Sequence, residues 1–166
     1  MGNDFPHELE VPDAFKHVAL TVEDSINFQL DTIEGEAQWN AILPPGGGYV
    51  TLGPPRYNHG GHPKRFRVSM FHGLSCLDTI RRSVMARHKD KSIPAGEDAR
   101  YCLNYVRQMI LCRSDIQLEW VRSEYGGKSV QPFVTHENCR DWTAVYREVE
   151  KLQEEAAARN FSTWAV

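Results

Sequence analysis

The sequence has no long hydrophobic run and no excess of basic residues, and these two absences exclude whole classes of protein. No stretch approaches the roughly 18 apolar residues that a membrane-spanning helix needs. Lys and Arg number 19 against 22 Asp and Glu, which gives a formal net charge of −3, whereas nucleic-acid-binding proteins usually present a strongly basic face. We therefore expect a soluble chain without a membrane anchor and without a nucleic-acid partner.

The sequence also lacks a Cys-x-x-Cys pair and a secretory signal. Its four cysteines are spread over positions 76, 102, 112 and 139, which excludes a zinc ribbon and a thioredoxin-type redox motif. The first residues have neither the basic start nor the apolar run of a signal peptide. At 166 residues the chain does not need cross-links to fold, so buried thiols and two disulfides are both open.

What the sequence does contain is an ordinary globular composition, 41% hydrophobic and 25% charged. Hydrophobic spacing, Gly and Pro breakers and β-branched runs predict its elements. The predicted helices cover residues 36–43, 70–88, 97–113 and 140–158, the predicted strands cover 15–22, 49–52, 66–69 and 115–121, and residues 128–139 are predicted as a loop. We expect a flexible arm over residues 1–14 and one domain over 15–166. The predicted class is α+β and mainly helical, with a central pair of helices and a long C-terminal helix.

Two stretches within the central pair of helices look like variants of one another. Each places polar residues four positions and one position before a cysteine, and positions i, i+3 and i+4 share one face of a helix. The two stripes are His72, Ser75 and Cys76 on the first helix, and Asp98, Tyr101 and Cys102 on the second. Because sites in helix bundles are built from side chains on facing helices, we expect the stripes to form the candidate site.

Each polar residue of these stripes has a structural and a chemical interpretation. His72 is either a buried or capping residue or a general acid/base, since imidazole titrates near neutral pH. Asp98 either compensates the helix dipole or orients His72 as a carboxylate partner. Tyr101 either packs or donates a hydrogen bond to a substrate carbonyl.

Three of the six histidines outside the stripes are further candidates. His59 and His62 stand in a Gly-rich loop and form either a surface loop or a metal-binding pair. His136 is either structural or, with His72 and Asp98, completes a two-His, one-carboxylate set of the kind that binds non-haem iron.

The segment Phe71-His72-x-x-Ser75-Cys76-Leu77-Asp78 resembles the first signature of the UstYa-like family. The run from Tyr101-Cys102-Leu103-Asn104 to Leu118-Glu119 resembles the second, and His136-x-x-Cys139-Arg140-Asp141-Trp142 matches the closing motif. The resemblance implies a fungal tailoring enzyme of specialised metabolism, a group that includes oxidative cyclases, hydroxylases and halogenases. It also implies a place in the secretory pathway or endomembrane lumen, and an association with copper.

The chain departs from the family at the residues that would bind copper. Both family signatures read His-x-x-His-Cys, but Ser75, Asp98 and Tyr101 occupy three of the four histidine positions and only His72 remains. Neutral hydroxyls are poor copper ligands. We therefore expect no cofactor, with copper or iron held by His72, Asp98 and His136 as the alternative.

All four cysteines stand at positions where the family has them. The secretory location that the resemblance implies favours disulfides over free thiols. Four cysteines allow three connectivities. We favour Cys76–Cys102 with Cys112–Cys139, because the first pair ties the two related helices together.

The main hypothesis is a cyclase that works without metal. It closes a ring in a polyketide, peptide or polyene intermediate, for example by a pericyclic reaction of the Diels–Alder type, by holding the reacting ends together. His72, Asp98 and Tyr101 are its predicted catalytic residues. Ser75, His136 and Arg100 are its predicted substrate contacts.

Two alternatives stay open. One is a metal-dependent oxidase or oxidative cyclase of the usual family type, and the other is a non-catalytic partner of an active homologue. In each case the expected partner is a small biosynthetic intermediate, with homo- or hetero-oligomers as a further option.

Overall fold

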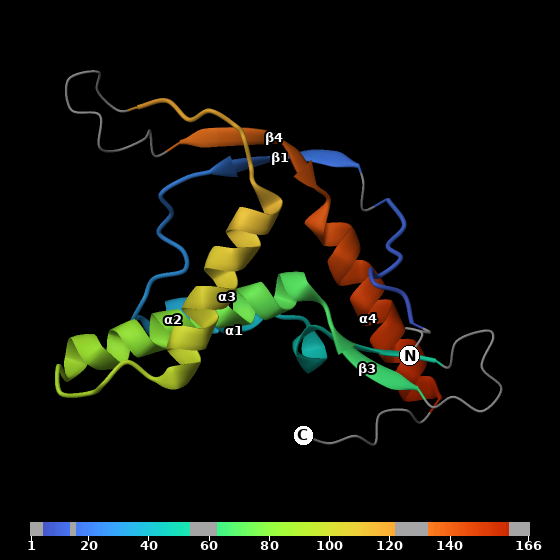
Figure 1. Ribbon diagram of the computed structural model, residues 1–166, viewed down its shortest axis with the longest axis horizontal. Coiled ribbons are helices and arrows are strands. Elements are labelled where there is room, and N and C mark those ends of the chain that lie inside the picture. Colours follow the sequence, from blue (N-terminus) through green and yellow to red (C-terminus); the bar gives the residue numbers. More distant parts are fainter. Residues whose placement is uncertain (1–4, 14–15, 54–62, 122–132, 160–166) are drawn as a thin grey trace.

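The structure is a computed structural model that describes residues 5–13, 16–53, 63–121 and 133–159. In these ranges four α-helices combine with two antiparallel two-stranded sheets (Figure 1). The predicted class, mainly helical α+β, is confirmed. None of the described helices has the length and hydropathy to cross a membrane. The elements, in order, are β1 (His17–Val22), α1 (Ile33–Ala41), the 3₁₀ turn η1 (Pro45–Gly48), β2 (Tyr49–Leu52), β3 (Lys64–Arg67), α2 (Ser69–Lys89), α3 (Glu97–Arg113), β4 (Val134–Arg140) and α4 (Trp142–Ala158).

The hydrophobic core lies where β2, α2 and α4 meet. Val50, Phe71 and Val149, one from each element, are its buried centre. The Phe71 ring packs edge-on against the Tyr146 ring of α4, with 4.8 Å between the centroids. Burying one such side chain contributes roughly 1.5–3 kcal/mol, so these contacts fix α2 and α4 on the β2–β3 sheet.

The glycine-rich turn η1 leads the chain into this core. Gly46, Gly47 and Gly48 have φ angles of 77°, 68° and 76°, a region that residues with a side chain rarely adopt. A Cβ atom on Gly48 would lie 2.3 Å from the Cβ atom of Phe71. Only glycine at this position therefore lets Phe71 lie directly against the backbone.

The second sheet corrects two predictions. β4 pairs antiparallel with β1, from His17 opposite Arg140 to Val22 opposite Val134, so residues 134–139 of the predicted loop belong to a strand. The predicted strand over 115–121 is irregular except at its last residue, and its side chains bury no face, since Ile116 and Leu118 are both 90% exposed. Residues 134–140 form the strand instead, because their backbone pairs with that of β1. A polar sequence such as that of β4 permits this pairing.

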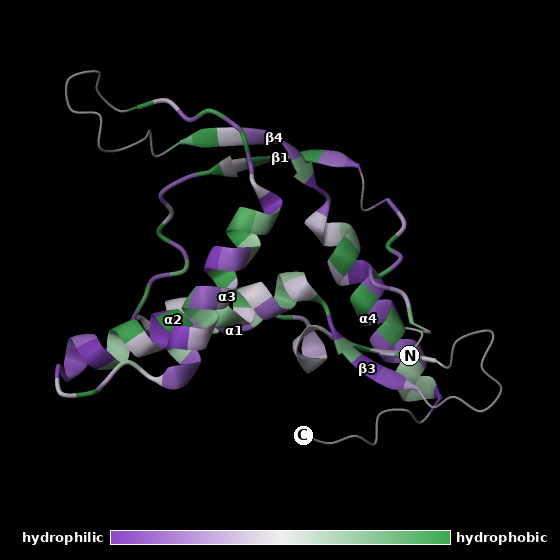
Figure 2. Cartoon of the chain, viewed as in Figure 1, coloured by the Kyte–Doolittle hydropathy of each residue, from purple (hydrophilic) through white to green (hydrophobic). Residues whose placement is uncertain are grey.

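α2 and α3 pack against each other as the predicted pair. α3 runs from Glu97 to Arg113. Ser114, the C-cap residue that follows it, has a left-handed φ of 40° and ends the helix. The sequence predicts a central α3, but the helix is less buried than a central helix would be, because Leu103 is 61% and Ile110 is 66% exposed. Figure 2 shows hydrophobic colour on the turns of α3 nearest the β1–β4 sheet.

A network of ion pairs joins α1 to α2. The buried Arg81 guanidinium lies 2.8 Å from the Asp78 carboxylate and also donates to Glu36 on α1 and to the Leu30 carbonyl oxygen. Arg82 lies 2.6 Å from the same Asp78 carboxylate. Arg81 and Arg82 therefore pair with Asp78 as part of the scaffold.

The described part of the predicted N-terminal arm lies against the β2–β3 sheet. Phe5 is buried, with its ring centroid 5.2 Å from that of Phe66. The Lys64 ammonium lies 5.1 Å above the Phe5 ring, and Leu9 packs on the core. Residues 5–13 therefore cover one side of the core.

Candidate functional site

The two polar stripes face each other where α2 packs on α3. His72 lies in the first turn of α2 and is half-buried. Its ring centroid is 4.1 Å from that of Tyr105 and 6.1 Å from that of Tyr101. Tyr101 and Tyr105 are one turn apart on α3, and their ring centroids are 6.4 Å apart. We call these three residues the His72 cluster.

The surroundings of His72 favour its neutral form. Burial lowers the pKa of His72 below its ordinary value of 6.5, and the positive charge of Arg67 lowers it further. Arg67 lies on β3, and its guanidinium is 5.0 Å from the centre of the Tyr49 ring. A neutral imidazole has a ring nitrogen that accepts a proton. His72 is therefore suited to act as a general base at neutral pH.

Tyr105 supplies a hydrogen-bond donor to the cluster. Its hydroxyl donates to the Ser69 carbonyl oxygen at 3.5 Å. Burial raises the pKa of Tyr105, and Cys76 and Tyr101 raise it further. The phenol therefore keeps its proton at neutral pH, and a hydroxyl of this kind can donate to an oxygen that gains negative charge.

Two buried thiols lie beside the cluster, Cys76 on α2 and Cys102 on α3. Burial raises the pKa of Cys76 to about 12, and its hydrogen bond with Cys102 adds to the effect. Because the thiolate is the form that attacks and binds metals, this thiol does neither at neutral pH. The four cysteines are free thiols in the structure. The fold brings the Cys76 and Cys102 thiols together. The disulfides Cys76–Cys102 and Cys112–Cys139 stay predictions.

Asp98, the predicted partner of His72, is exposed in the first turn of α3. Acidic residues are favoured there by the helix dipole. The ring that packs on His72 is that of Tyr105, from the third turn of the same helix, with 4.1 Å between the centroids. Aromatic packing therefore orients His72 in the structure.

The predicted substrate contacts Ser75 and Arg100 lie on the same two helices. Ser75 is half-buried, and its carbonyl oxygen accepts a hydrogen bond from the Thr79 hydroxyl at 3.0 Å. Arg100 is exposed, with its guanidinium 3.8 Å from the Glu97 carboxylate. Ser75 is thus better placed than Arg100 to meet a molecule bound between the helices.

His136 lies on β4, apart from the region where α2 and α3 cross (Figure 1). Its Nδ1 atom is 3.4 Å from the Asp115 carboxylate, and its Nε2 atom is 3.6 Å from the Glu119 carboxylate. These contacts hold the segment after α3 against the β1–β4 sheet. His136 therefore has a structural role here, and its predicted contact with substrate stays a prediction.

The predicted metal sets are not assembled in the part of the chain that the structure describes. No group of three or more His, Cys, Asp or Glu side chains is placed there to hold a metal ion. The set of His72, Asp98 and His136 is therefore not brought together. His59 and His62 lie outside the described residues.

Two residues near the site were missed by the sequence reasoning, Tyr105 and Arg67. Tyr105 carried a usable signal, since it stands one helical turn after Tyr101 and shares its face. Arg67 carried none, because it lies before the motif helix and reaches His72 only through the fold.

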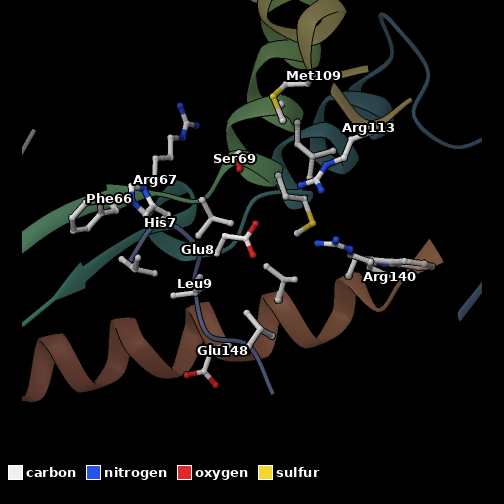
Figure 3. Close-up of a pocket in the computed structure, with 18 of the residues that line it drawn as sticks. His7, Glu8, Leu9, Phe66, Arg67, Ser69, Met109, Arg113, Arg140 and Glu148 are labelled. Carbon is white, nitrogen blue, oxygen red and sulfur yellow. The ribbon is translucent and has the colours of Figure 1, made fainter. Parts of the chain in front are cut away.

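A large pocket adjoins the cluster, with a volume of about 1660 Å³ (Figure 3). Its walls come from the N-terminal arm, the β2–β3 sheet, α2, α3 and α4, and most of the lining side chains are apolar. Ser69 and Arg67 line the pocket. The Ser69 carbonyl oxygen accepts the Tyr105 hydrogen bond, and the positive charge of Arg67 lowers the pKa of His72. The pocket and the His72 cluster therefore share a wall.

The sequence that forms the motif helices and the core matches a known protein family. A family model described as mycotoxin biosynthesis protein UstYa matches residues 34–149. The chain belongs to the UstYa family. The matched range contains α1, both motif helices and most of the core, so the predicted family is confirmed.

Two curated members of the UstYa family are similar to the chain. The UstYa family oxidase phomYb of Diaporthe leptostromiformis is 25% identical over 121 residues, which cover 68% of this chain and 48% of that protein. The oxidase ustYa of Aspergillus flavus is 28% identical over 88 residues, which cover 52% of this chain and 41% of that protein. The chain thus spans about half the length of these relatives. No solved structure matches it.

Proposed function

We propose that this UstYa-family chain is a tailoring enzyme that oxidises an intermediate of a fungal specialised metabolite. Both similar relatives are named oxidases, and the family model is that of a mycotoxin biosynthesis protein. These names favour oxidation over the metal-free ring closure that the sequence first suggested.

The observation that carries the proposal is the packing of His72 on Tyr105 at the crossing of the motif helices. A neutral imidazole accepts a proton from a substrate C–H, N–H or O–H group, while an external two-electron oxidant that binds with the substrate takes up the electrons. The Tyr101 and Tyr105 hydroxyls donate to a substrate oxygen that becomes more negative in the same step.

The residues at the family's copper positions do not fit a copper centre. Copper in proteins prefers imidazole and thiolate ligands. Of the four positions, Ser75 and Tyr101 supply hydroxyls and Asp98 an exposed carboxylate, so His72 is the single imidazole. Cys76 stays a thiol at neutral pH. We therefore assign the proton-transfer role to His72 itself and no step to a metal at these positions.

Restoring the three histidines tests this fit directly. The triple variant Ser75→His, Asp98→His, Tyr101→His is expected to bind copper stoichiometrically, whereas the natural chain retains little after dialysis, because three added imidazoles complete the set. Copper is measured by plasma mass spectrometry after size exclusion. Replacing His72 by Ala in the triple variant should lower the copper content again. Stoichiometric, His72-dependent copper in the natural chain would overturn the assignment.

Ring closure without oxidation is a second candidate function. It is favoured by the replacement of three motif histidines by Ser75, Asp98 and Tyr101. A cyclase of this kind needs the reacting ends held together and a donor to a carbonyl group. The Tyr101 and Tyr105 hydroxyls, beside an apolar pocket, can meet that need.

Comparing metabolites of the producing fungus separates these functions. The intact gene, a deletion and a His72→Ala allele are compared by high-resolution mass spectrometry. Oxidation predicts that the deletion accumulates a precursor with two more hydrogens, or one oxygen fewer, than the lost product. Ring closure predicts a precursor of identical mass. A His72→Ala allele that makes normal product while the deletion does not would contradict the oxidation proposal, which assigns the proton transfer to His72.

A further inference from the structure

Arg67 stands where the pocket meets the His72 cluster. It is the last residue of β3, opposite Tyr49 of β2, and it lines the pocket. The carbonyl oxygen of the next residue, Val68, accepts a hydrogen bond from the His72 amide at 3.1 Å. The end of β3 is thus joined directly to the turn of α2 that carries His72. The charge of Arg67 acts on both His72 and Tyr105, so its guanidinium lies within electrostatic reach of the proposed base.

The half-buried Arg67 guanidinium has no polar partner in the part of the chain that the structure describes. Its Nε atom is buried there without a hydrogen bond, and none of the ion pairs between described residues includes it. Its contact is with the face of the Tyr49 ring, whose centre lies 5.0 Å away. Buried polar groups in folded proteins are nearly always hydrogen-bonded. An orphaned donor on the wall of a pocket therefore suggests a partner that enters the pocket.

Arg81 shows how this fold treats an arginine that belongs to the scaffold. Its buried guanidinium donates to the Asp78 and Glu36 carboxylates and to the Leu30 carbonyl oxygen. The chain itself thus supplies acceptors on several sides of that group. Arg67 receives no such acceptor from the described residues, so ion pairing within the scaffold does not account for its position.

The pocket lining has charges of both signs. The carboxylates of Glu8, Glu10 and Asp115 line it, but no ion pair between described residues joins any of them to Arg67. Asp115 faces His136, with 3.4 Å between the charged groups, and Glu8 and Glu10 are exposed on the N-terminal arm. Figure 3 shows the Arg67 guanidinium extended away from the Glu8 carboxylate. The unpaired donors are therefore a local feature of the Arg67 corner and need no net positive charge of the whole pocket.

We propose that Arg67 binds an acceptor oxygen, the oxygen of a carbonyl or carboxylate group, of a molecule held beside the His72 cluster. A guanidinium presents several N–H donors in a fixed plane, which suits such an oxygen. The Tyr105 hydroxyl, whose hydrogen bond to the Ser69 carbonyl oxygen is long at 3.5 Å, is a second donor nearby. That this molecule is the substrate of His72 rests on the proposed function, whereas its binding does not.

The test follows the ring protons of His72 by NMR while three probes with the same aromatic ring are added at constant ionic strength. The probes are benzoate, benzamide and benzylammonium, and the His72 signal is assigned by its absence in His72→Gln. Benzoate is expected to bind about tenfold more tightly than benzylammonium, with benzamide between them, because only the first two carry an acceptor oxygen. Bound benzoate should also raise the pKa of His72, since a nearby anion favours the imidazolium. The signal of His88, exposed at the end of α2, should not move.

Variants of Arg67 separate binding from a scaffold role. Arg67→Gln should weaken benzoate about tenfold, and Arg67→Lys, which keeps the charge but loses the planar donors, about threefold. Arg113→Gln is the matched control, because it removes the same charge from an exposed residue of the same pocket, and it should leave benzoate binding unchanged. Arg67→Met should keep the Tm of the natural chain, since the guanidinium has no hydrogen bond or ion pair with the described residues to lose.

Equal binding of benzoate and benzylammonium would overturn the proposal. So would benzoate binding that is unchanged in Arg67→Gln or equally weakened in Arg113→Gln, and so would a clear drop in the Tm of Arg67→Met. These measurements need no turnover. Arg67-dependent benzoate binding in a chain whose His72→Ala variant keeps full turnover would refute only the proposed function, whereas His72-dependent turnover without probe binding would refute only the site at Arg67.

Discussion

Replacing Gly48 by alanine is expected to lower the free energy of unfolding by about 3 kcal/mol or more. A Cβ atom at Gly48 would lie 2.3 Å from the Cβ and 2.5 Å from the Cγ atom of Phe71. Overpacking of a core costs about 1–3 kcal/mol, and a positive φ of 76° adds roughly 1–2 kcal/mol for alanine. Phe71 is fully buried and cannot move aside.

Two neighbouring glycines separate these two costs. Gly47→Ala keeps the positive φ but has only Tyr49 atoms at 3.8 Å or more near the added carbon, so it should cost only the backbone part, about 1–2 kcal/mol. Gly53→Ala adds neither cost, since no atom of the described residues lies within 4 Å of the added carbon. It should leave the free energy of unfolding nearly unchanged. Urea unfolding followed by circular dichroism gives all three values. A Gly48→Ala chain as stable as Gly53→Ala would show that Phe71 does not pack as described.

Replacing His72 by alanine is expected to lower turnover by about 10²–10⁴-fold, the usual contribution of a positioned general base. The ring that is removed contacts both Tyr105 and Tyr101. Tyr105→Phe should have a smaller effect, about tenfold, because it keeps the packing and removes one hydroxyl donor. Turnover is measured as product formed from the accumulated precursor.

His88→Ala is the matched control for this variant. His88 is exposed in the last turn of the same helix, so its loss should leave turnover unchanged. Thermal unfolding of both variants separates loss of chemistry from loss of fold. Turnover of His72→Ala within a few fold of the His88→Ala chain would remove His72 from the reaction.

The helices were predictable from the sequence because each carries its own signals. The range 97–113 predicted for the second motif helix is that of α3, since its acidic first turn and apolar spacing are local features. Its burial was not predictable in the same way. Apolar spacing identifies a face, but Leu103 and Ile110 are exposed because no described element covers that face.

The strands were less predictable, because a strand depends on a partner that lies far along the chain. Residues 115–121 alternate and β4 does not, yet β4 pairs with β1 across more than a hundred residues. The segment 114–120 instead holds His136 through Asp115 and Glu119. Pairing between distant segments, not local pattern, decided which segment became the strand.

The candidate site was predictable in its place and only partly in its members. Helical spacing placed His72 and Tyr101 on facing stripes, and their rings are 6.1 Å apart in the structure. The same spacing gave Asp98 equal standing with Tyr101. The crossing of α2 and α3 brought Tyr105 in the third turn of α3, and not Asp98 in the first, onto His72. A crossing geometry of this kind depends on the packing of whole helices and not on one motif.

The most direct test of the central claim, that His72 acts as a neutral base, is the dependence of kcat/KM on pH. Burial and Arg67 lower the pKa of His72 below 6.5, so the base form is present at neutral pH and is lost only when the pH falls below that value. We predict a rate that stays level as the pH falls through 6.5, declines at lower pH, and loses this decline in His72→Gln. A decline centred at or above 6.5, or one that His72→Gln retains, would contradict the claim.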